Sequence, residues 1–148
     1  MRKIKYIFID SDCPNDNGKS RHHAVSLFRH HFTINEEGLV LHPIDISSTV
    51  NLIEGPIYDR DKYNKCSISI RYCGSLLPHA WLIDPNTSCK SAMQQRAALL
   101  NLLVQLRGLY PSAKILGASE LDGKELYSKN IIVSDTMNVL REELSNMP

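Results

Sequence analysis

The chain has 148 residues and a formal net charge of +1, with 43% hydrophobic and 22% charged residues. This composition suits one soluble globular domain over residues 1–148 with enough apolar residues for a core. The near-neutral charge and scattered basic residues exclude strong attraction to nucleic acid or to an acidic membrane. Because the apolar run at the N-terminus is too short for a secretory signal, we expect a cytoplasmic protein as encoded, which leaves the cytoplasm only by release or specialised export.

The N-terminal part of the chain predicts one strand and one hairpin around a polar loop. Ile4–Ile9 is an apolar, β-rich run and predicts a central strand, and residues 11–20 are rich in Asp, Asn, Pro and Gly and indicate a loop. Residues 21–31 predict a short helix. Phe32–Ile34 and Leu39–Leu41 flank a four-residue turn that ends in glycine, and they predict a β-hairpin.

The middle of the chain predicts one strand between two loops. Residues 43–65 and 74–90 carry glycine, proline and aspartate without clear periodicity, which indicates extended loops. Ser67–Tyr72 alternates in polarity and predicts a strand with both isoleucines on one face.

A long amphipathic helix is predicted next. Ser91 and Gln94 have the spacing of a capping box, and apolar residues then recur at three- and four-residue intervals. Pro111 should end this helix, and Ala113–Gly117 predicts a buried strand. The predicted apolar face of the helix consists of Met93, Ala97, Leu100, Leu103, Val104 and Leu106.

A final helix is predicted over Asp135–Leu144, with Ser134 or Asp135 as its N-cap. Strands and helices in this order predict an α/β domain with a mixed central β-sheet flanked by helices.

The four cysteines are Cys13, Cys66, Cys73 and Cys89, and their spacing matches neither a C-x-x-C pair nor a known zinc motif. Cys66 and Cys73 border one predicted strand at an odd separation, which puts them on opposite faces and prevents them from sharing a metal. We expect four reduced, largely buried thiols, and disulfides stay open if the protein is exported.

The order of these elements and several short stretches resemble the type 2 N-acetylmuramoyl-L-alanine amidases of bacteria and phages. These zinc enzymes are similar to phage lysozymes of the T7 kind and to peptidoglycan recognition proteins. The stretches that carry the resemblance are IDSD (Ile9–Asp12), HHFTINEEG (His30–Gly38), DRDKYNKCSISI (Asp59–Ile70), SAMQ (Ser91–Gln94), GASEL (Gly117–Leu121) and KNIIVSD (Lys129–Asp135). They span nearly the whole chain, so the resemblance implies an amidase-like fold.

The resemblance also implies that the zinc site of the family has been lost. The three ligand positions of the family fall on Asp10, Ala118 and Ile131, and neither alanine nor isoleucine has a donor atom. We therefore expect a pseudoenzyme with the amidase fold and no cofactor.

Other functional positions of the family are partly kept in this chain. His30 falls on the catalytic tyrosine, Asp59 on the histidine of H-x-K-G-Y-N, and Lys129 on the lysine that helps to stabilise the oxyanion. In the alternative interpretation Lys129 is a surface lysine, Tyr63 packs its ring against the sheet, and Asn64 makes a turn. The residues that the resemblance places in a ligand-binding groove are His30, His31, Asp59, Tyr63, Asn64 and Lys129.

A metal site formed elsewhere is a further alternative, because four histidines cluster between residues 22 and 31. In a continuous helix, His23 and His30 would lie about 10.5 Å apart along the axis, which is too far for a shared ion. A bent segment could still bring histidines together with Asp10 or Asp12. The more ordinary interpretation is that the histidines are solvated or take part in packing.

Three classes of function stay open at this point. The leading one is binding of a peptidoglycan fragment or a related ligand without hydrolysis. The second is an active N-acetylmuramoyl-L-alanine amidase with an altered metal site, for which zinc would be the cofactor. The third is a protein-interaction module on the same fold, which an exposed apolar patch away from the groove would favour.

Overall fold

The computed structural model describes residues 3–11, 30–49, 63–74, 76, 89–117 and 131–148. These residues contain the strands β1 (Tyr6–Ser11), β2 (Phe32–Ile34), β3 (Val40–Leu41), β4 (Ser67–Tyr72) and β5 (Lys114–Gly117), and the helices α3 (Cys89–Leu109) and α4 (Ile131–Ser145). The helix predicted over residues 21–31 lies outside them except for His30 and His31, which are not helical. Neither α3 nor α4 is long and apolar enough to cross a membrane.

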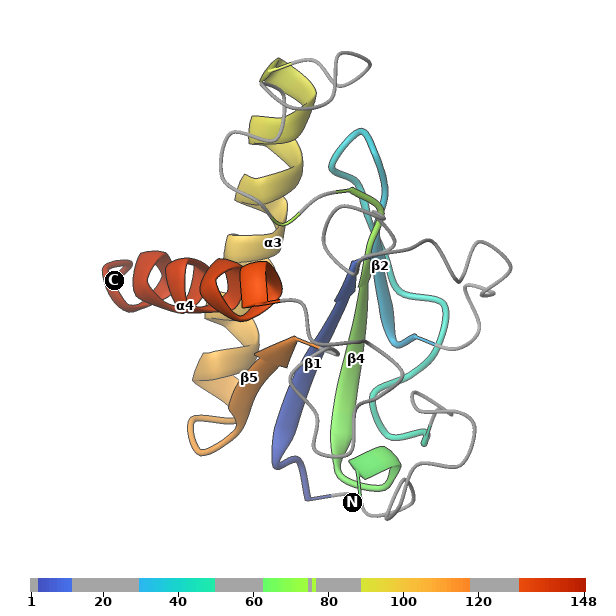
Figure 1. Cartoon of the computed structure of the whole chain (residues 1–148). Helices are drawn as coiled ribbons and strands as arrows, with labels where there is room; N and C mark the ends of the chain where they lie inside the picture. The colour runs from blue at the N-terminus through green and yellow to red at the C-terminus, as the bar shows by residue number, and fades with distance from the viewer. Residues whose placement is uncertain (1–2, 12–29, 50–62, 75, 77–88, 118–130) are drawn as a thin grey trace.

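The strands form one mixed sheet with the order β3-β2-β4-β1-β5 (Figure 1). β1 pairs in parallel with β4 and β5, β2 pairs in parallel with β4, and β3 runs antiparallel to β2 at the edge. Both helices lie on the same side of this sheet (Figure 1). The predicted α/β fold is therefore confirmed, although β1 begins at Tyr6 rather than at Ile4.

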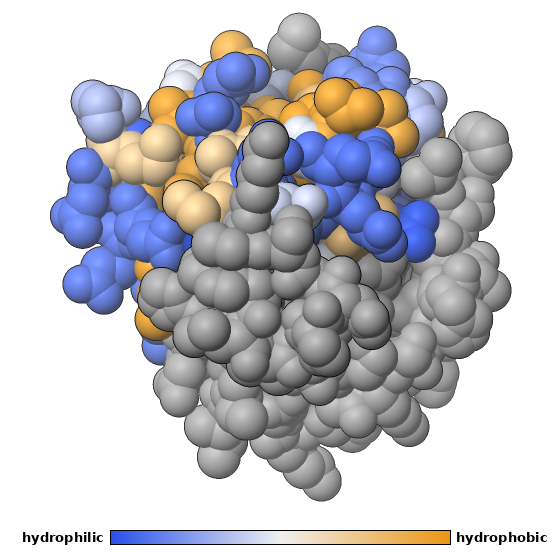
Figure 2. Space-filling model, turned by 90° about the horizontal axis from the view of Figure 1, so that it is seen from above, coloured by the Kyte–Doolittle hydropathy of each residue, from blue (hydrophilic) through white to orange (hydrophobic). Residues whose placement is uncertain are grey.

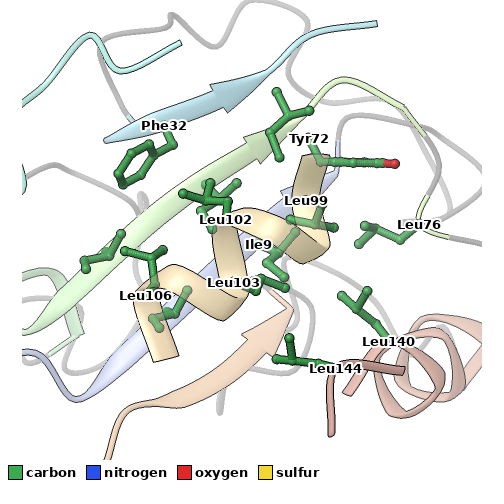
Figure 3. Packing of buried hydrophobic residues seen from close by; sticks show 14 of the residues in the cluster. Ile9, Phe32, Tyr72, Leu76, Leu99, Leu102, Leu103, Leu106, Leu140 and Leu144 are labelled. Carbon is green, nitrogen blue, oxygen red and sulfur yellow. The ribbon is translucent and has the colours of Figure 1, made fainter. Parts of the chain in front are cut away.

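The main core lies between the sheet and the two helices. Alternation along β1 and β4 points Ile7, Ile9, Ile68 and Ile70 into this core, and each is at most 1% exposed. Each such side chain contributes about 1.5–3 kcal/mol by leaving water. The leucines that cover them from the helices (Figure 3) are Leu99, Leu102, Leu103, Leu106, Leu140 and Leu144.

The start of α3 differs from the prediction. The helix begins at Cys89, so Ser91 lies inside its first turn and cannot be the N-cap residue. The capping box predicted from Ser91 and Gln94 is therefore wrong. The predicted end is confirmed, because α3 stops at Leu109, ahead of Pro111.

The buried face of α3 also differs from the prediction. Met93 is 59% exposed and Ala97 is exposed, whereas Leu100 and Val104 are half-buried and pack against the core as predicted. The face that packs on the sheet contains a glutamine at its N-terminal end, which hides it from a search for apolar periodicity. Its members are Gln95, Leu99, Leu102, Leu103 and Leu106, of which only Leu103 and Leu106 had been predicted.

The β2–β3 hairpin is confirmed, and a single side chain organises its turn. Asn35 Oδ1 accepts hydrogen bonds from the backbone N–H groups of Glu37 (3.0 Å) and Leu39 (2.9 Å). Gly38 has φ of 85°, and a Cβ built there would lie 3.1 Å from the backbone of Gln94. Glycine is therefore required both by the turn and by the close approach of α3.

The start of α4 also differs from the prediction. α4 begins at Ile131, so the N-cap predicted at Ser134 or Asp135 is wrong.

Arginine side chains fix α4 against α3 and β5. Arg107 of α3 donates to the carbonyl of Leu144 at 2.9 Å, near the negative end of the α4 dipole. Arg141 of α4 donates to the carbonyl of Ile115 on β5 at 2.9 Å.

Candidate functional site

The sheet has a second face, opposite α3 and α4, that is markedly more polar than the first. Because side chains alternate along a strand, Asp10 projects to this face together with Phe8, and Ser69 and Arg71 project to it from β4. Thr33 projects to it from β2, since Phe32 and Ile34 lie in the main core. We call this side of the sheet the second face.

Aromatic rings cover the second face near the amino end of β1. The ring centroid of Tyr63 lies 5.3 Å from that of Tyr6 and 5.9 Å from that of Phe8, and Tyr63 is only 8% exposed. The Tyr63 carbonyl accepts a hydrogen bond from the Ser67 hydroxyl, and Asn64 is buried in the same turn. The Tyr63 ring therefore packs against the sheet, as the alternative interpretation of the sequence predicts.

His31 joins β4 to the loop after β3. Its Nδ1 accepts the backbone N–H of Ser69 at 3.0 Å, so the ring proton lies on Nε2, which donates to the carbonyl of Ser48 at 2.6 Å. His31 is 0% exposed. This pattern describes a neutral, structural histidine, and the contact with a ligand that the sequence suggests stays a prediction.

His30 also reaches Ser69, but through the side chain. Its Nδ1 lies 2.6 Å from Ser69 Oγ, and both residues are at most 2% exposed. A buried imidazole paired with a hydroxyl can hold or pass a proton, although the burial of both groups keeps them away from bulk water. The catalytic role that the resemblance gives to His30 stays a prediction.

A Thr-Arg-Asp row crosses the second face at the carboxyl ends of three parallel strands. The register aligns Thr33 of β2 with Arg71 of β4, and Arg71 with Asp10 of β1. Thr33 is 1% exposed and Asp10 is 8% exposed, whereas Arg71 is half-buried. Among the described residues, Thr33 Oγ1 is buried with no hydrogen-bond partner. We refer to these residues as the polar row.

The loop that receives the His31 bond is shaped by Asp45. Asp45 Oδ1 accepts the backbone N–H of Ser47 at 2.8 Å, and the Asp45 carbonyl accepts that of Ser48 at 3.0 Å. These bonds to Ser47 are the main reason that the pKa of Asp45 lies below its ordinary value, and the neighbouring His42 lowers this pKa further.

Several residues predicted for the site cannot be placed. Asp59, Lys129 and Ala118 lie outside the described residues, and Ile131 is the first residue of α4. Within the described ranges, no three His, Cys, Asp or Glu side chains are grouped so that they could hold a metal ion. The roles of these residues and the absence of a cofactor therefore remain predictions.

The cysteine prediction can be followed for two of the four residues. Cys66 and Cys73 carry thiols and are half-buried rather than buried. The Cys66 thiol lies 3.8 Å from the Tyr63 carbonyl. Cys13 lies outside the described residues, as does the side chain of Cys89.

Thr33 and Arg71 were not identified from the sequence. The signal was present in part, because a charged residue inside the alternating stretch Ser67–Tyr72 must project to the less apolar side of its strand. Their proximity to Asp10 depends on the strand order, which local sequence does not reveal.

The sheet order and the two described helices on one side of the sheet define an α/β fold. The solved structure of the Ph2119 endolysin from Thermus scotoductus MAT2119 bacteriophage Ph2119 matches this chain with a TM-score of 0.58 and 17% identity, over 92% of this chain and 86% of that chain. At this identity the likeness establishes the fold alone. No protein-family model matches the chain, and no curated protein matches it by sequence.

Proposed function

We propose that this protein binds peptidoglycan fragments on the second face of its sheet and does not hydrolyse them. The observation that carries the proposal is the polar row at the carboxyl ends of β2, β4 and β1. In sheets with parallel strands, ligands bind outside the carboxyl ends of the strands. A buried polar group without a hydrogen-bond partner is costly, and Thr33 Oγ1 lacks such a partner among the described residues.

The choice of ligand rests on the fold and on the resemblance. A solved structure that matches this chain is that of a bacteriophage endolysin. The amidase-like stretches of the sequence point to peptidoglycan as the polymer. Together they support a muramoyl peptide as the ligand class.

We infer the absence of hydrolysis from the side chains that stand at the three zinc-ligand positions of the family. Asp10 supplies one carboxylate, but Ala118 and Ile131 supply no donor, and a catalytic zinc site needs three protein ligands. The register also places the guanidinium-bearing Arg71 next to Asp10 on the same face, and a fixed positive charge there disfavours a divalent cation.

One observation favours the protein-interaction module as a second candidate. Leu39, Val40 and Leu41 follow one another along the edge hairpin and are 60%, 43% and 40% exposed. Gly38 approaches the backbone of α3 beside Met93, which is 59% exposed. Figure 2 shows apolar surface interspersed with hydrophilic surface on the described part of the molecule.

The experiment combines metal analysis, binding and turnover on the full chain. Protein is purified without chelator or a nickel column, its zinc is measured by elemental mass spectrometry, and calorimetry follows binding of muramoyl peptides. The expected result is saturable binding, no stoichiometric metal, and no release of peptide detected by mass spectrometry. One zinc per chain or release of peptide would establish the amidase alternative instead, and no binding at all would favour the interaction module.

A further inference from the structure

We propose that the polar row is a carboxylate-recognition site, in which Arg71 binds an acidic group of the ligand's peptide and Thr33 adds a hydrogen bond. This inference deepens the proposed function and rests on it for the identity of the ligand. Arg71 and Thr33 are not among the site positions that the amidase resemblance implies, whereas Asp10 is one of its three zinc positions.

The strand register supplies the geometry. Arg71 pairs with Thr33 on one side and with Asp10 on the other, and all three project to the second face. Neighbouring strands lie about 4.8 Å apart, so the backbones of Arg71 and Thr33 are direct neighbours across the sheet. Arg71 is half-buried: part of the residue is open to solvent, and its Nε atom is buried.

Thr33 is the observation that points to a ligand. Its hydroxyl oxygen is buried, the residue is 1% exposed, and no hydrogen-bond partner lies near Oγ1 in the described part of the chain. A valine at this position would fill the same space without that cost. A ligand oxygen next to Arg71 would give this hydroxyl a partner.

The charges of the row indicate a carboxylate rather than a phosphate. Arg71 and Asp10 carry opposite formal charges at paired positions of β4 and β1, so the three residues of the row have a formal charge near zero. A dianionic phosphate would be repelled by Asp10, whereas a single carboxylate can use two donors of the planar guanidinium and leave others for Asp10. Lysine cannot provide this forked geometry.

The test compares two ligands that differ only in their acidic groups. N-acetylmuramoyl-L-alanyl-D-glutamate has free α- and γ-carboxylates, and the corresponding diamide has an amide in place of each. We expect the wild-type protein to bind the acid about tenfold more tightly than the amide, since a charge-assisted hydrogen bond is involved. Equal affinity for the two ligands would overturn the inference while the proposed function stands.

Variants test whether the polar row causes the preference for the acid over the amide. Arg71→Met should bind the acid about 10- to 100-fold more weakly and lose the preference, Arg71→Lys should retain part of it, and Thr33→Val should weaken binding about 3- to 10-fold. Lys114→Met is the matched control. It removes a positive charge from the same face at the amino end of β5, level with Tyr6 and about 13 Å from the row along the strands. A preference that persists in Arg71→Met, or disappears in Lys114→Met, would contradict the assignment.

A second measurement uses unmodified protein, so it does not depend on the folding of a variant or on the muramoyl ligand. The Nε–H signal of Arg71 is followed by NMR during titration with glutarate and with glutaramide. A saturable shift with glutarate alone supports the carboxylate site even if no muramoyl peptide binds. No shift with glutarate overturns the site.

Discussion

At the residue scale, His31 shows how one buried side chain can join two segments of the chain. The ring links the Ser69 N–H to the Ser48 carbonyl and is 0% exposed. His31→Ala leaves both backbone groups without this partner and opens a cavity, so we expect the free energy of unfolding to fall by about 2–4 kcal/mol in urea denaturation. His42→Ala is the control, because His42 is exposed and stacks on Phe32, and its loss should cost at most about 1 kcal/mol. Equal costs for the two variants would show that the His31 bonds contribute little.

Gln94 and Gln95 are adjacent in sequence and opposite in their surroundings. Gln95 is 5% exposed, and its Nε2 donates to the carbonyls of Asn35 (2.9 Å) and Cys73 (2.7 Å). Gln95→Ala should therefore lower the free energy of unfolding by about 1–3 kcal/mol. Gln94→Ala, on the exposed side of the same helix, should change it by less than about 0.5 kcal/mol. Thermal and urea denaturation of the two variants decide this, and similar losses would remove the bridging role of Gln95.

Asp45 makes the stability of the folded protein depend on pH. Its pKa is lowered in the folded protein, chiefly by the hydrogen bonds from Ser47, so its contribution to stability is present above the unfolded pKa of about 3.9 and is lost as the pH falls through the lower folded pKa. Asp45→Asn keeps an acceptor for Ser47 but cannot titrate. The urea midpoint of this variant should fall less steeply than that of the wild type below about pH 4. If the urea midpoints of the variant and the wild type fall equally steeply from about pH 5 to about pH 2.5, this assignment is contradicted.

At the scale of elements, two glycines should respond to alanine in opposite directions. Gly108 lies near the end of α3, and no atom lies within 4 Å of the position that an added Cβ would take, so Gly108→Ala should stabilise the protein by about 0.5–1 kcal/mol. A Cβ at Gly74 would lie 2.4 Å from Gln95 Oε1. Gly74→Ala should displace the Gln95 amide from its two carbonyl partners and cost about 1–3 kcal/mol. Shifts of the melting temperature with the same sign in both variants would contradict this account.

The elements themselves could be predicted from the sequence to a large extent. Ser67–Tyr72 and the hairpin around Asn35 have local signals, namely alternation and turn chemistry, and both are confirmed. The face of α3 was partly mispredicted because leucines occupy two overlapping stripes and the buried stripe begins with Gln95. The polar row was not predicted, since Thr33 and Arg71 meet only through the parallel pairing of β2 with β4.

At the scale of the whole molecule, α3 and α4 pack on the side of the sheet opposite the candidate site. Arg96 of α3 makes a two-point ion pair with Glu143 of α4, with Nε–Oε2 at 3.3 Å and Nη2–Oε1 at 2.5 Å, and it also donates to the Leu76 carbonyl at 2.7 Å. The side chains are 16% and 39% exposed, so solvent screens the pair only in part.

The contribution of the ion pair between Arg96 and Glu143 can be measured directly. In a double-mutant cycle with Arg96→Met and Glu143→Gln, the coupling energy should be about 0.5–1 kcal/mol at low salt and should shrink in about 1 M NaCl, because a partly exposed ion pair is screened. Arg96→Met should cost more than Glu143→Gln, since it also deprives the Leu76 carbonyl of its donor. Neither variant should alter the preference for an acidic ligand, because Arg71 and Thr33 project from the opposite face of the sheet. Absence of coupling at low salt would show that the pair contributes nothing to the docking of α4, and a changed ligand preference would show that the two faces are not independent.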